Sequence, residues 1–397
     1  MSEGPVAGRP PSSHAPGDQQ SPATREMRSQ RDGWLAKLDF DQAPFTIAWE
    51  VTRACAYACN HCRADAQPAR DRNELNTDEA MHLIDQLAAF DSKPILVLTG
   101  GDPLMRRDLT TLAAHANEQG LRVSLTPTAT ALVTTKRMHA IRAAGIRRVA
   151  FSLDAPDAAT HDAFRGFPGS FDRTLAGLRN ATAAGLSIQV NTTVYASNAD
   201  SLKQMVPLLE ELGVVQWSVF FLVPTGRGTQ LQMLSAEGHE RTLNWLYDLA
   251  QDAPFDVKAT AAPQYRRIAH QRANDDSPAA NAGAGYQFAD GLNRPAKGVN
   301  DGRGFMFISH TGEVMPSGFL PISAGNVRTH DPVELYRDSP LFKCLRNPAL
   351  LKGKCGRCEF KVVCGGSRAR AYGVTGNYLA ADPSCSYNPP ATQRRVA

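Results

Sequence analysis

The sequence has no apolar run long enough to cross a membrane, and its first residues lack the apolar core of a signal peptide. Its net charge at pH 7 is only +4, and no block of lysines and arginines forms a stripe. These absences disfavour membrane and nucleic-acid binding, and they predict a soluble, cytoplasmic protein. The 397 residues are enough for one large α/β domain and a smaller module.

Cysteine is absent from a long central stretch, residues 63–343. Seven of the eight cysteines form two groups on either side of this stretch, and the eighth is Cys344. A secreted disulfide framework would scatter its cysteines in pairs along the chain. Two tight groups instead predict reduced thiols that bind metal.

Three segments contain few apolar residues. Residues 1–31 are rich in Pro, Ser, Gly, Gln and Arg, which predicts a disordered leader. Residues 271–300 predict a flexible loop or interdomain linker, and residues 389–397 a frayed tail. We therefore expect a barrel domain at residues 40–260 and a small auxiliary domain at residues 304–388.

Apolar strands alternate with amphipathic helices in the predicted barrel domain. Three of the helical patterns end at glycines, as helices commonly do. Strand–helix units in series predict a parallel sheet, because parallel neighbours need crossover connections. Six units are too few for a closed eight-unit barrel, so we predict an α/β fold with a partial, open (β/α)6 barrel and a small C-terminal α+β module. The predicted strands are residues 45–51, 94–98, 122–125, 148–153, 188–192 and 217–222.

Three cysteines, Cys55, Cys59 and Cys62, lie in one loop that follows the first predicted strand. The loop is therefore at the C-terminal end of a strand, where α/β barrels keep their catalytic groups. Three thiolates leave one iron of a four-iron cluster without a protein ligand, and an open metal position distinguishes reactive sites from structural ones. A plain zinc or structural site is the alternative.

This loop, together with Thr99-Gly100-Gly101-Asp102-Pro103 at the end of the next strand, resembles the radical S-adenosylmethionine (radical SAM) superfamily. The resemblance implies that the three thiolates hold a [4Fe-4S] cluster whose open iron is chelated by S-adenosylmethionine (SAM). One electron would then cleave SAM to methionine and a 5′-deoxyadenosyl radical that abstracts hydrogen from a substrate. A reducing partner such as flavodoxin or ferredoxin is implied as well.

The resemblance assigns Gly100, Gly101, Asp102 and Pro103 to the methionine part of SAM. Glycines allow the backbone to approach the ammonium group closely, and Asp102 adds an acceptor for it. The family more often has Glu at the position of Asp102, so this shorter side chain would reach further or act through water. Without the cysteine loop, the same four residues would be read as a turn.

Four residues on later strands and helices complete the predicted SAM site. Ser152 and Asp154 end the fourth strand and are candidates for ribose or substrate contacts, although they could equally cap the next helix. Arg165 is the candidate partner of the methionine carboxylate, and a surface ion pair is its alternative role. Asn191 ends the fifth strand, and residues 221–228 end the sixth, near the expected position of adenine.

The second cysteine group consists of Cys355, Cys358, Cys364 and Cys385. Four thiolates make a closed site, which spacing alone assigns either to structural zinc or to an electron-relaying [4Fe-4S] cluster. The surrounding sequence resembles the SPASM extension of radical SAM enzymes or its shorter relative, the twitch domain. That resemblance implies an iron–sulfur module with a second, auxiliary [4Fe-4S] cluster.

A full SPASM extension binds two clusters and would have cysteines where Ser317 and Arg368 stand. We therefore expect the ligands of only one auxiliary cluster. Cys344 is left over and reads as an apolar filler.

Within the superfamily, the chain most resembles enzymes of heme and heme d1 assembly and peptide maturases. Residues 221–228 and 364–372 suggest the enzymes that modify tetrapyrroles rather than the peptide maturases. Such tetrapyrrole enzymes, however, often carry a cysteine where Ser367 stands. Basic and aromatic groups within residues 263–267, and Arg368 and Arg370, are candidates to hold propionates or peptide carboxylates, or are solvated surface charges.

These observations favour an enzyme that oxidises a small-molecule substrate, a tetrapyrrole or another multi-carboxylate side chain. Maturation of a ribosomal peptide by the same chemistry is the first alternative, and a non-catalytic iron–sulfur electron-transfer protein is the second. The last has no use for an open iron beside a Gly-Gly-Asp-Pro segment.

Overall fold

The computed structural model describes residues 39–276 and 298–390. The predicted leader, most of the predicted linker and residues 391–397 of the tail lie outside these ranges. The described residues belong to one unit of structure.

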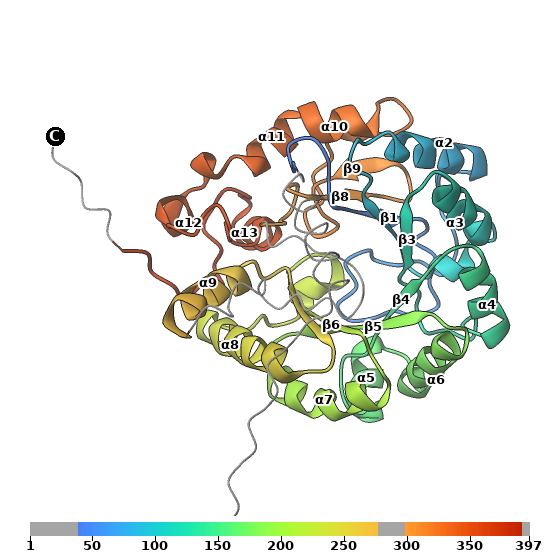
Figure 1. The fold of residues 1–397 in the computed structure, drawn as a ribbon, viewed down its shortest axis with the longest axis horizontal. Coiled ribbons are helices and arrows are strands. Elements are labelled where there is room, and N and C mark those ends of the chain that lie inside the picture. The colour runs from blue at the N-terminus through green and yellow to red at the C-terminus, as the bar shows by residue number, and fades with distance from the viewer. Residues whose placement is uncertain (1–38, 277–297, 391–397) are drawn as a thin grey trace, which may run out of the picture. The chain divides into compact units, whose positions relative to one another are not determined.

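A curved sheet runs through this unit, and helices lie around its outer face (Figure 1). Its strand order is β10-β9-β8-β1-β2-β3-β4-β5-β6-β7, and all neighbours from β8 to β7 are parallel. Because β10 and β7 are the two ends of this order, the sheet is open, as predicted. The strands are β1 (Thr46–Glu50), β2 (Ile95–Thr99), β3 (Arg122–Leu125), β4 (Arg148–Ser152), β5 (Ser187–Val194), β6 (Gln216–Phe221), β7 (Asp256–Thr260), β8 (Phe305–Ile308), β9 (Glu313–Met315) and β10 (Gly325–Asn326).

All six predicted strands are present in the predicted order, which confirms the α/β class. The structure adds β7 beyond β6. The sequence signal for β7 was weak because Asp256 and Lys258 interrupt its apolar pattern. The structure also places β8 beside β1, with Thr46 opposite Phe305, so the sheet continues across the predicted boundary at residue 304.

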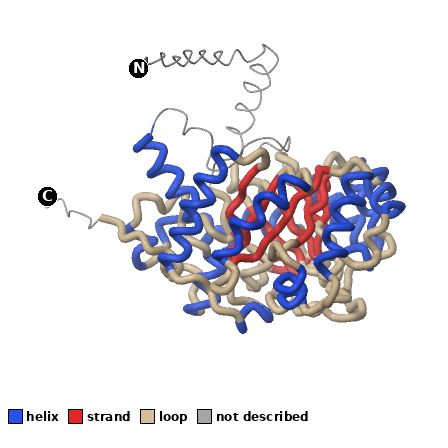
Figure 2. The backbone as a smooth tube through the Cα atoms, turned by 90° about the horizontal axis from the view of Figure 1, so that it is seen from below, coloured by secondary structure: helices blue, strands red, loops and turns tan. Residues whose placement is uncertain are grey.

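Most of the helices lie around the outside of the curved sheet, as Figures 1 and 2 show. The first begins at a capping box, in which Asn76 and Glu79 each bond the other's backbone, and it buries Leu83, Ile84 and Leu87. The α-helices are α2 (Thr77–Ala88), α3 (Leu109–Glu118), α4 (Thr135–Ala143), α5 (Ala158–Arg165), α6 (Ser170–Ala183), α7 (Leu202–Glu211), α8 (Ala236–Asp252), α9 (Gln264–Asp276), α10 (Pro332–Asp338), α11 (Pro340–Arg346), α12 (Gly353–Arg357) and α13 (Arg368–Thr375). Within the described residues, no helix is long and apolar enough to cross a membrane.

Strand alternation divides the core from a cavity inside the curve of the sheet. In β1, Ile47 and Trp49 are fully buried in the core, whereas Thr46 and Ala48 line the cavity. In β5 the buried positions alternate with polar ones, and Asn191 and Thr193 line the cavity. The polar positions in the C-terminal half of β5 therefore face the cavity.

The C-terminal segment is tied to the sheet by a buried arginine. Arg370, on α13, forms an ion pair of 3.1 Å with Asp382, and both side chains are fully buried. Its Nη2 also donates to the carbonyl of Ala261, after β7, at 2.7 Å. Burial of a charge is costly unless it is paired and hydrogen-bonded, and both conditions are met here. This link fixes the second cysteine group relative to the strand ends.

Candidate active site

The cavity inside the sheet has a volume of about 450 Å³ and is lined by all three cysteines of the first loop. Five of the eight predicted cofactor residues line the same space. Those that line it are Gly100, Gly101, Ser152, Arg165 and Asn191. The structure thus brings together residues from four different strand ends, which sequence spacing alone could not join.

The cysteine loop directs its sulfur atoms toward donors. Cys55 Sγ accepts a hydrogen bond from the backbone N–H of Tyr57 at 3.4 Å. Arg165, the last residue of α5, donates through Nη1 to Cys59 Sγ at 3.7 Å. Donors and positive charge beside these sulfurs stabilise thiolates, which are the form that binds metal. Burial raises the pKa of the Cys55 thiol, so metal binding here would release protons.

Gly100 and Gly101 are required by close backbone packing. A methyl group at Gly100 would lie 2.3 Å from the carbonyl oxygen of Thr52, and one at Gly101 would lie 2.4 Å from that of Ala54. The N–H of Gly101 donates to the Thr52 carbonyl at 2.8 Å. The two glycines therefore hold the end of β2 against the segment that leads into the cysteine loop.

Two predicted ligand-binding carboxylates do not line the cavity. Asp102 is fully buried and accepts hydrogen bonds from Thr130 Oγ1 at 2.8 Å and from the N–H of Leu104 at 3.1 Å. Burial raises its pKa to about 6, despite these bonds. Pro103 next to it is also buried, at the start of a short 3₁₀ turn. These bonds help to fix the turn, and the expected contact of Asp102 with a ligand ammonium stays a prediction.

Asp154 acts on the cavity through Arg165. Its carboxylate accepts from Arg165 Nε at 2.7 Å and from the N–H of Thr193 at 2.7 Å. Burial would raise the pKa of Asp154, but Arg165 and the neighbouring histidines hold it below its usual range. Arg165 is therefore no surface ion pair, since its side chain is buried between Asp154 and Cys59.

The sequence analysis gave a different role to one segment that contacts the cysteine loop. Residues 221–228 were expected near adenine, and Phe221 does line the cavity. The later part instead packs on the loop: Arg227 Nε donates to the Cys59 carbonyl at 2.9 Å, and its N–H donates to the Cys62 carbonyl at 3.0 Å. A methyl group at Gly226 would lie 2.5 Å from that Cys62 oxygen, so glycine is needed there.

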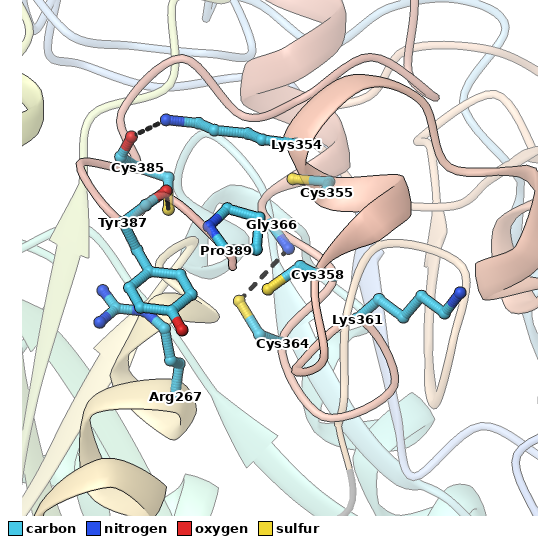
Figure 3. Close-up of a pocket in the computed structure, with 11 residues that line it drawn as sticks. Arg267, Lys354, Cys355, Cys358, Lys361, Cys364, Gly366, Cys385, Tyr387 and Pro389 are labelled. Carbon is cyan, nitrogen blue, oxygen red and sulfur yellow. Dashed lines mark hydrogen bonds between the residues drawn. The ribbon is translucent and has the colours of Figure 1, made fainter. Parts of the chain in front are cut away.

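The second cysteine group surrounds a separate hollow (Figure 3). Cys355, Cys358, Cys364 and Cys385 all line it. Cys355 Sγ accepts from the N–H of Asp382 and Cys364 Sγ accepts from the N–H of Gly366, both at 3.4 Å. Burial raises the pKa of the Cys364 thiol to about 12. Arg267, Lys354 and Lys361 are on the lining of the hollow, and the Lys361 ammonium points away from the sulfurs (Figure 3). The charges of Arg267 and Lys354 suit a negatively charged group held by four thiolates.

Comparison with known proteins identifies the family. A model described as the Radical SAM superfamily matches residues 49–210. The AdoMet-dependent heme synthase of Nitratidesulfovibrio vulgaris is 44% identical over 345 residues, which cover 86% of this chain and 92% of that protein. The chain belongs to the radical SAM superfamily. The AdoMet-dependent heme synthase of Methanosarcina barkeri is 43% identical, over 87% of this chain and 97% of the relative.

A solved structure has a similar fold. Streptococcus suis SuiB, in complex with its precursor peptide SuiA, has a TM-score of 0.66 and covers 95% of this chain and 84% of its own. Its sequence identity is only 16%, so the likeness shows the fold alone. The predicted superfamily is confirmed, and the protein is an enzyme of that superfamily.

The residues of the cavity fit the cofactors that the radical SAM family implies. Three thiols from one loop share a space with glycines, polar strand ends and a buried arginine. That is the donor set for a cluster with one open iron and for a zwitterionic ligand bound to it. The individual contacts predicted for SAM stay predictions.

The structure corrects the predicted role of several basic residues. Arg368 and Arg370 cannot hold a substrate carboxylate, because both are buried and bonded inside the protein. Arg368 Nη1 donates to the carbonyls of Tyr378 and Ala380, and its Nη2 lies 3.8 Å from Cys355 Sγ. Arg267 faces the second hollow. Only Arg266 of these candidates lines the active-site cavity.

Sequence reasoning missed other residues of the cavity wall. Thr128, after β3, donates to the Gly101 carbonyl at 2.7 Å and lies 3.6 Å from Cys55 Sγ. Arg63 and Lys258 add positive charge to the wall, and Phe307 adds an aromatic ring. Arg63 follows Cys62 directly, so the sequence alone could have indicated it. Lys258 and Phe307 reach the cavity only because of the positions of β7 and β8 in the sheet, which were not predicted.

Two buried histidines should make the fold sensitive to acid. Burial lowers the pKa of His161 and of His239 from about 6.5 to about 4. The folded protein keeps both neutral at pH 5, whereas the unfolded chain protonates them below about pH 6.5. The free energy of unfolding should therefore fall between pH 6.5 and 4, by up to about 1.4 kcal/mol per pH unit for each histidine.

Urea unfolding at pH 8, 6.5 and 5 measures this loss. His239→Leu should flatten the pH dependence, while His139→Leu, at an exposed position, serves as the matched control. Identical slopes for both variants and the wild type would show that His239 does not contribute to the acid sensitivity.

Proposed function

We propose that this radical SAM enzyme oxidises carboxylate-bearing side chains of a tetrapyrrole. The observation that carries the proposal is the charge of the cavity wall. Four of the described lining residues are cationic, Arg63, Arg165, Lys258 and Arg266, against one carboxylate, Asp301. The Asp301 carboxylate already accepts a hydrogen bond from the N–H of Ala369 at 2.9 Å. The cavity therefore suits a polyanionic substrate.

Aromatic rings on the wall support a flat, apolar centre for that substrate. Phe305 and Phe307 project from β8, Phe220 comes from β6, and Phe319 follows β9. Phe220 and Phe319 lie 6.5 Å apart between ring centroids. Aromatic side chains pack well against a planar conjugated ring, and cationic groups at its edge would bind carboxylates.

The relatives point to the same substrate class. Both AdoMet-dependent heme synthases match this chain over nearly their whole length at more than 40% identity. By their names they produce heme with the use of SAM. The similarity therefore supports a heme precursor as the substrate here, in preference to a peptide.

We assign the first site to Cys55, Cys59 and Cys62, with SAM bound against Gly100, Gly101, Ser152, Arg165 and Asn191. When bound, the cluster and SAM would supply the 5′-deoxyadenosyl radical that takes a hydrogen atom from the substrate. The chain's own residues position these groups: Asp154 fixes Arg165, and Arg227 fixes the carbonyls of the cysteine loop.

We assign an auxiliary [4Fe-4S] cluster to Cys355, Cys358, Cys364 and Cys385. Four thiols around one hollow suit either a closed zinc site or a four-iron cluster. The resemblance of the surrounding sequence to SPASM-type extensions favours the cluster. Its expected role is to accept the electron left on the oxidised product, and flavodoxin or ferredoxin is the expected reductant of the first cluster.

Anaerobic reconstitution with iron and sulfide, followed by SAM, dithionite and iron coproporphyrin, tests the function. We expect 5′-deoxyadenosine together with a porphyrin that has lost the elements of formic acid from a propionate side chain. Without 5′-deoxyadenosine the enzyme assignment would be wrong for this chain. If 5′-deoxyadenosine forms but no porphyrin is altered, only the substrate assignment fails, and peptides become the next substrates to assay.

A further inference from the structure

Arg63 is the arginine of the cavity wall whose hydrogen-bonding capacity is least used. It directly follows Cys62 and lines the cavity, with 19% of its side chain exposed. Its Nη1 lies 3.0 Å from Glu50 Oε2, and its guanidinium stacks 4.4 Å from the centroid of the Phe307 ring. Among the residues that the structure describes, no other side chain or carbonyl accepts a hydrogen bond from it.

The other two arginines of the wall are already engaged. Arg165 donates to Asp154 and to Cys59 Sγ. Arg266 donates to the carbonyl oxygens of Val363 at 2.6 Å and Val299 at 2.8 Å. Arg63 therefore has the most N–H groups left for an anion inside the cavity.

Glu50 holds the Arg63 side chain in place but does not cancel all of the positive charge around it. This carboxylate ends β1, is fully buried, and is shared between Arg63 at 3.0 Å, Arg53 at 3.2 Å and His310 at 2.9 Å. Burial would raise the pKa of Glu50, but the neighbouring cations lower it to about 2. Glu50 is therefore ionised at neutral pH. Because one carboxylate serves two guanidiniums, positive charge remains for a ligand.

The loop after β9 leaves room for this arrangement. A methyl group at Gly318 would lie 2.9 Å from Arg63 Nε and 3.0 Å from its Cζ. Glycine at this position allows the guanidinium to lie between the loop and the Phe307 ring. The side chain is thus held on three sides, by Glu50, Phe307 and Gly318, before any substrate arrives.

We infer, on the basis of the proposed function, that Arg63 binds a carboxylate of the tetrapyrrole beside the three-cysteine loop. Arginine binds carboxylates through paired, parallel N–H groups, and pre-organisation lowers the entropic cost of that contact. Since Arg63 adjoins Cys62, an anchored carboxylate would determine which edge of the ring faces the radical site. Arg63 is thereby assigned as a residue that selects the side chain to be oxidised.

Binding of the substrate to the reconstituted enzyme, measured by porphyrin absorbance, tests this role apart from turnover. We expect Arg63→Gln to weaken the binding of iron coproporphyrin on the order of 10- to 100-fold, as loss of a hydrogen-bonded charge pair does. The methyl ester of the same porphyrin should bind the variant and the wild type equally. Arg63→Lys, which keeps the charge but loses the paired donors, should lie between.

Arg53→Gln is the matched control, because Arg53 shares Glu50 but does not line the cavity. It should change porphyrin affinity by less than about twofold, because a partly exposed charge outside the cavity contributes little to binding. The inference is overturned if Arg63→Gln binds like the wild type, if Arg53→Gln weakens binding as much, or if the ester is affected equally. A fall in affinity for SAM alone would assign Arg63 to the cofactor and also overturn it. If the wild type binds neither porphyrin, the tetrapyrrole assignment itself is wrong, and this inference falls with it.

Discussion

The Cys59→Ala enzyme will release no 5′-deoxyadenosine from SAM above background. Cys59 lines the active-site cavity with Cys55 and Cys62, and Arg165 donates to its sulfur. A three-thiolate site has no spare ligand, so loss of one thiolate removes the cluster and with it the only source of the electron that cleaves SAM. Chromatography of the products after anaerobic incubation with dithionite measures the loss.

Cys344→Ala provides the control for this result. Cys344 is partly exposed, on α11, and lines neither the active-site cavity nor the second hollow. Its removal should leave SAM cleavage and iron content at the wild-type level. Cleavage retained by Cys59→Ala would mean that the radical is generated elsewhere in the chain.

Cys358→Ala should separate the two cysteine groups by iron content. The reconstituted wild type is expected to hold about eight irons per chain, and this variant about four, because a closed four-thiolate site loses its cluster with one of its ligands. Formation of 5′-deoxyadenosine should continue, because Cys358 lines only the second hollow. Oxidised product should fall strongly, since the electron left on the substrate loses its acceptor.

Elemental analysis of the same samples distinguishes the metals at the second hollow. About four irons with one zinc in the wild type would make the site structural, and Cys358→Ala would then lose zinc and fold stability. Unchanged product formation by a variant that lacks the second cluster would contradict the electron-accepting role.

The chemistry of the first site was legible in the sequence because its residues are close together and chemically distinctive. Cys55, Cys59 and Cys62 follow a strand, and Gly100 and Gly101 end the next one. Parallel strands bring their C-terminal ends to one edge, so two local motifs become one site. The same logic placed Ser152, Arg165 and Asn191 on the cavity.

Properties that depend on long-range pairing were not legible. Arg368 and Arg370 look like surface charges in the sequence. In the structure both are buried, and they bond to carbonyl oxygens and to Asp382. Asp102 looks like a ligand for an ammonium group in the sequence. In the structure its carboxylate also accepts a hydrogen bond from Thr130, 28 residues later. Arg63 gains its position from Glu50 and from Phe307, which lies on a strand that a local pattern placed in a separate module.

The pairing of β8 with β1 has a consequence for how such chains can be recombined. The backbone of β1 bonds β2 on one side and β8 on the other, and β8 comes from beyond residue 300. A protein that ended before β8 would leave one side of β1 without partners, and an exposed strand edge promotes aggregation. The segment that contains β1 and the segment that begins at β8 therefore cannot be exchanged independently of each other. A chimera between relatives would need to exchange β1 and β8 together, because each strand pairs with the other in the sheet.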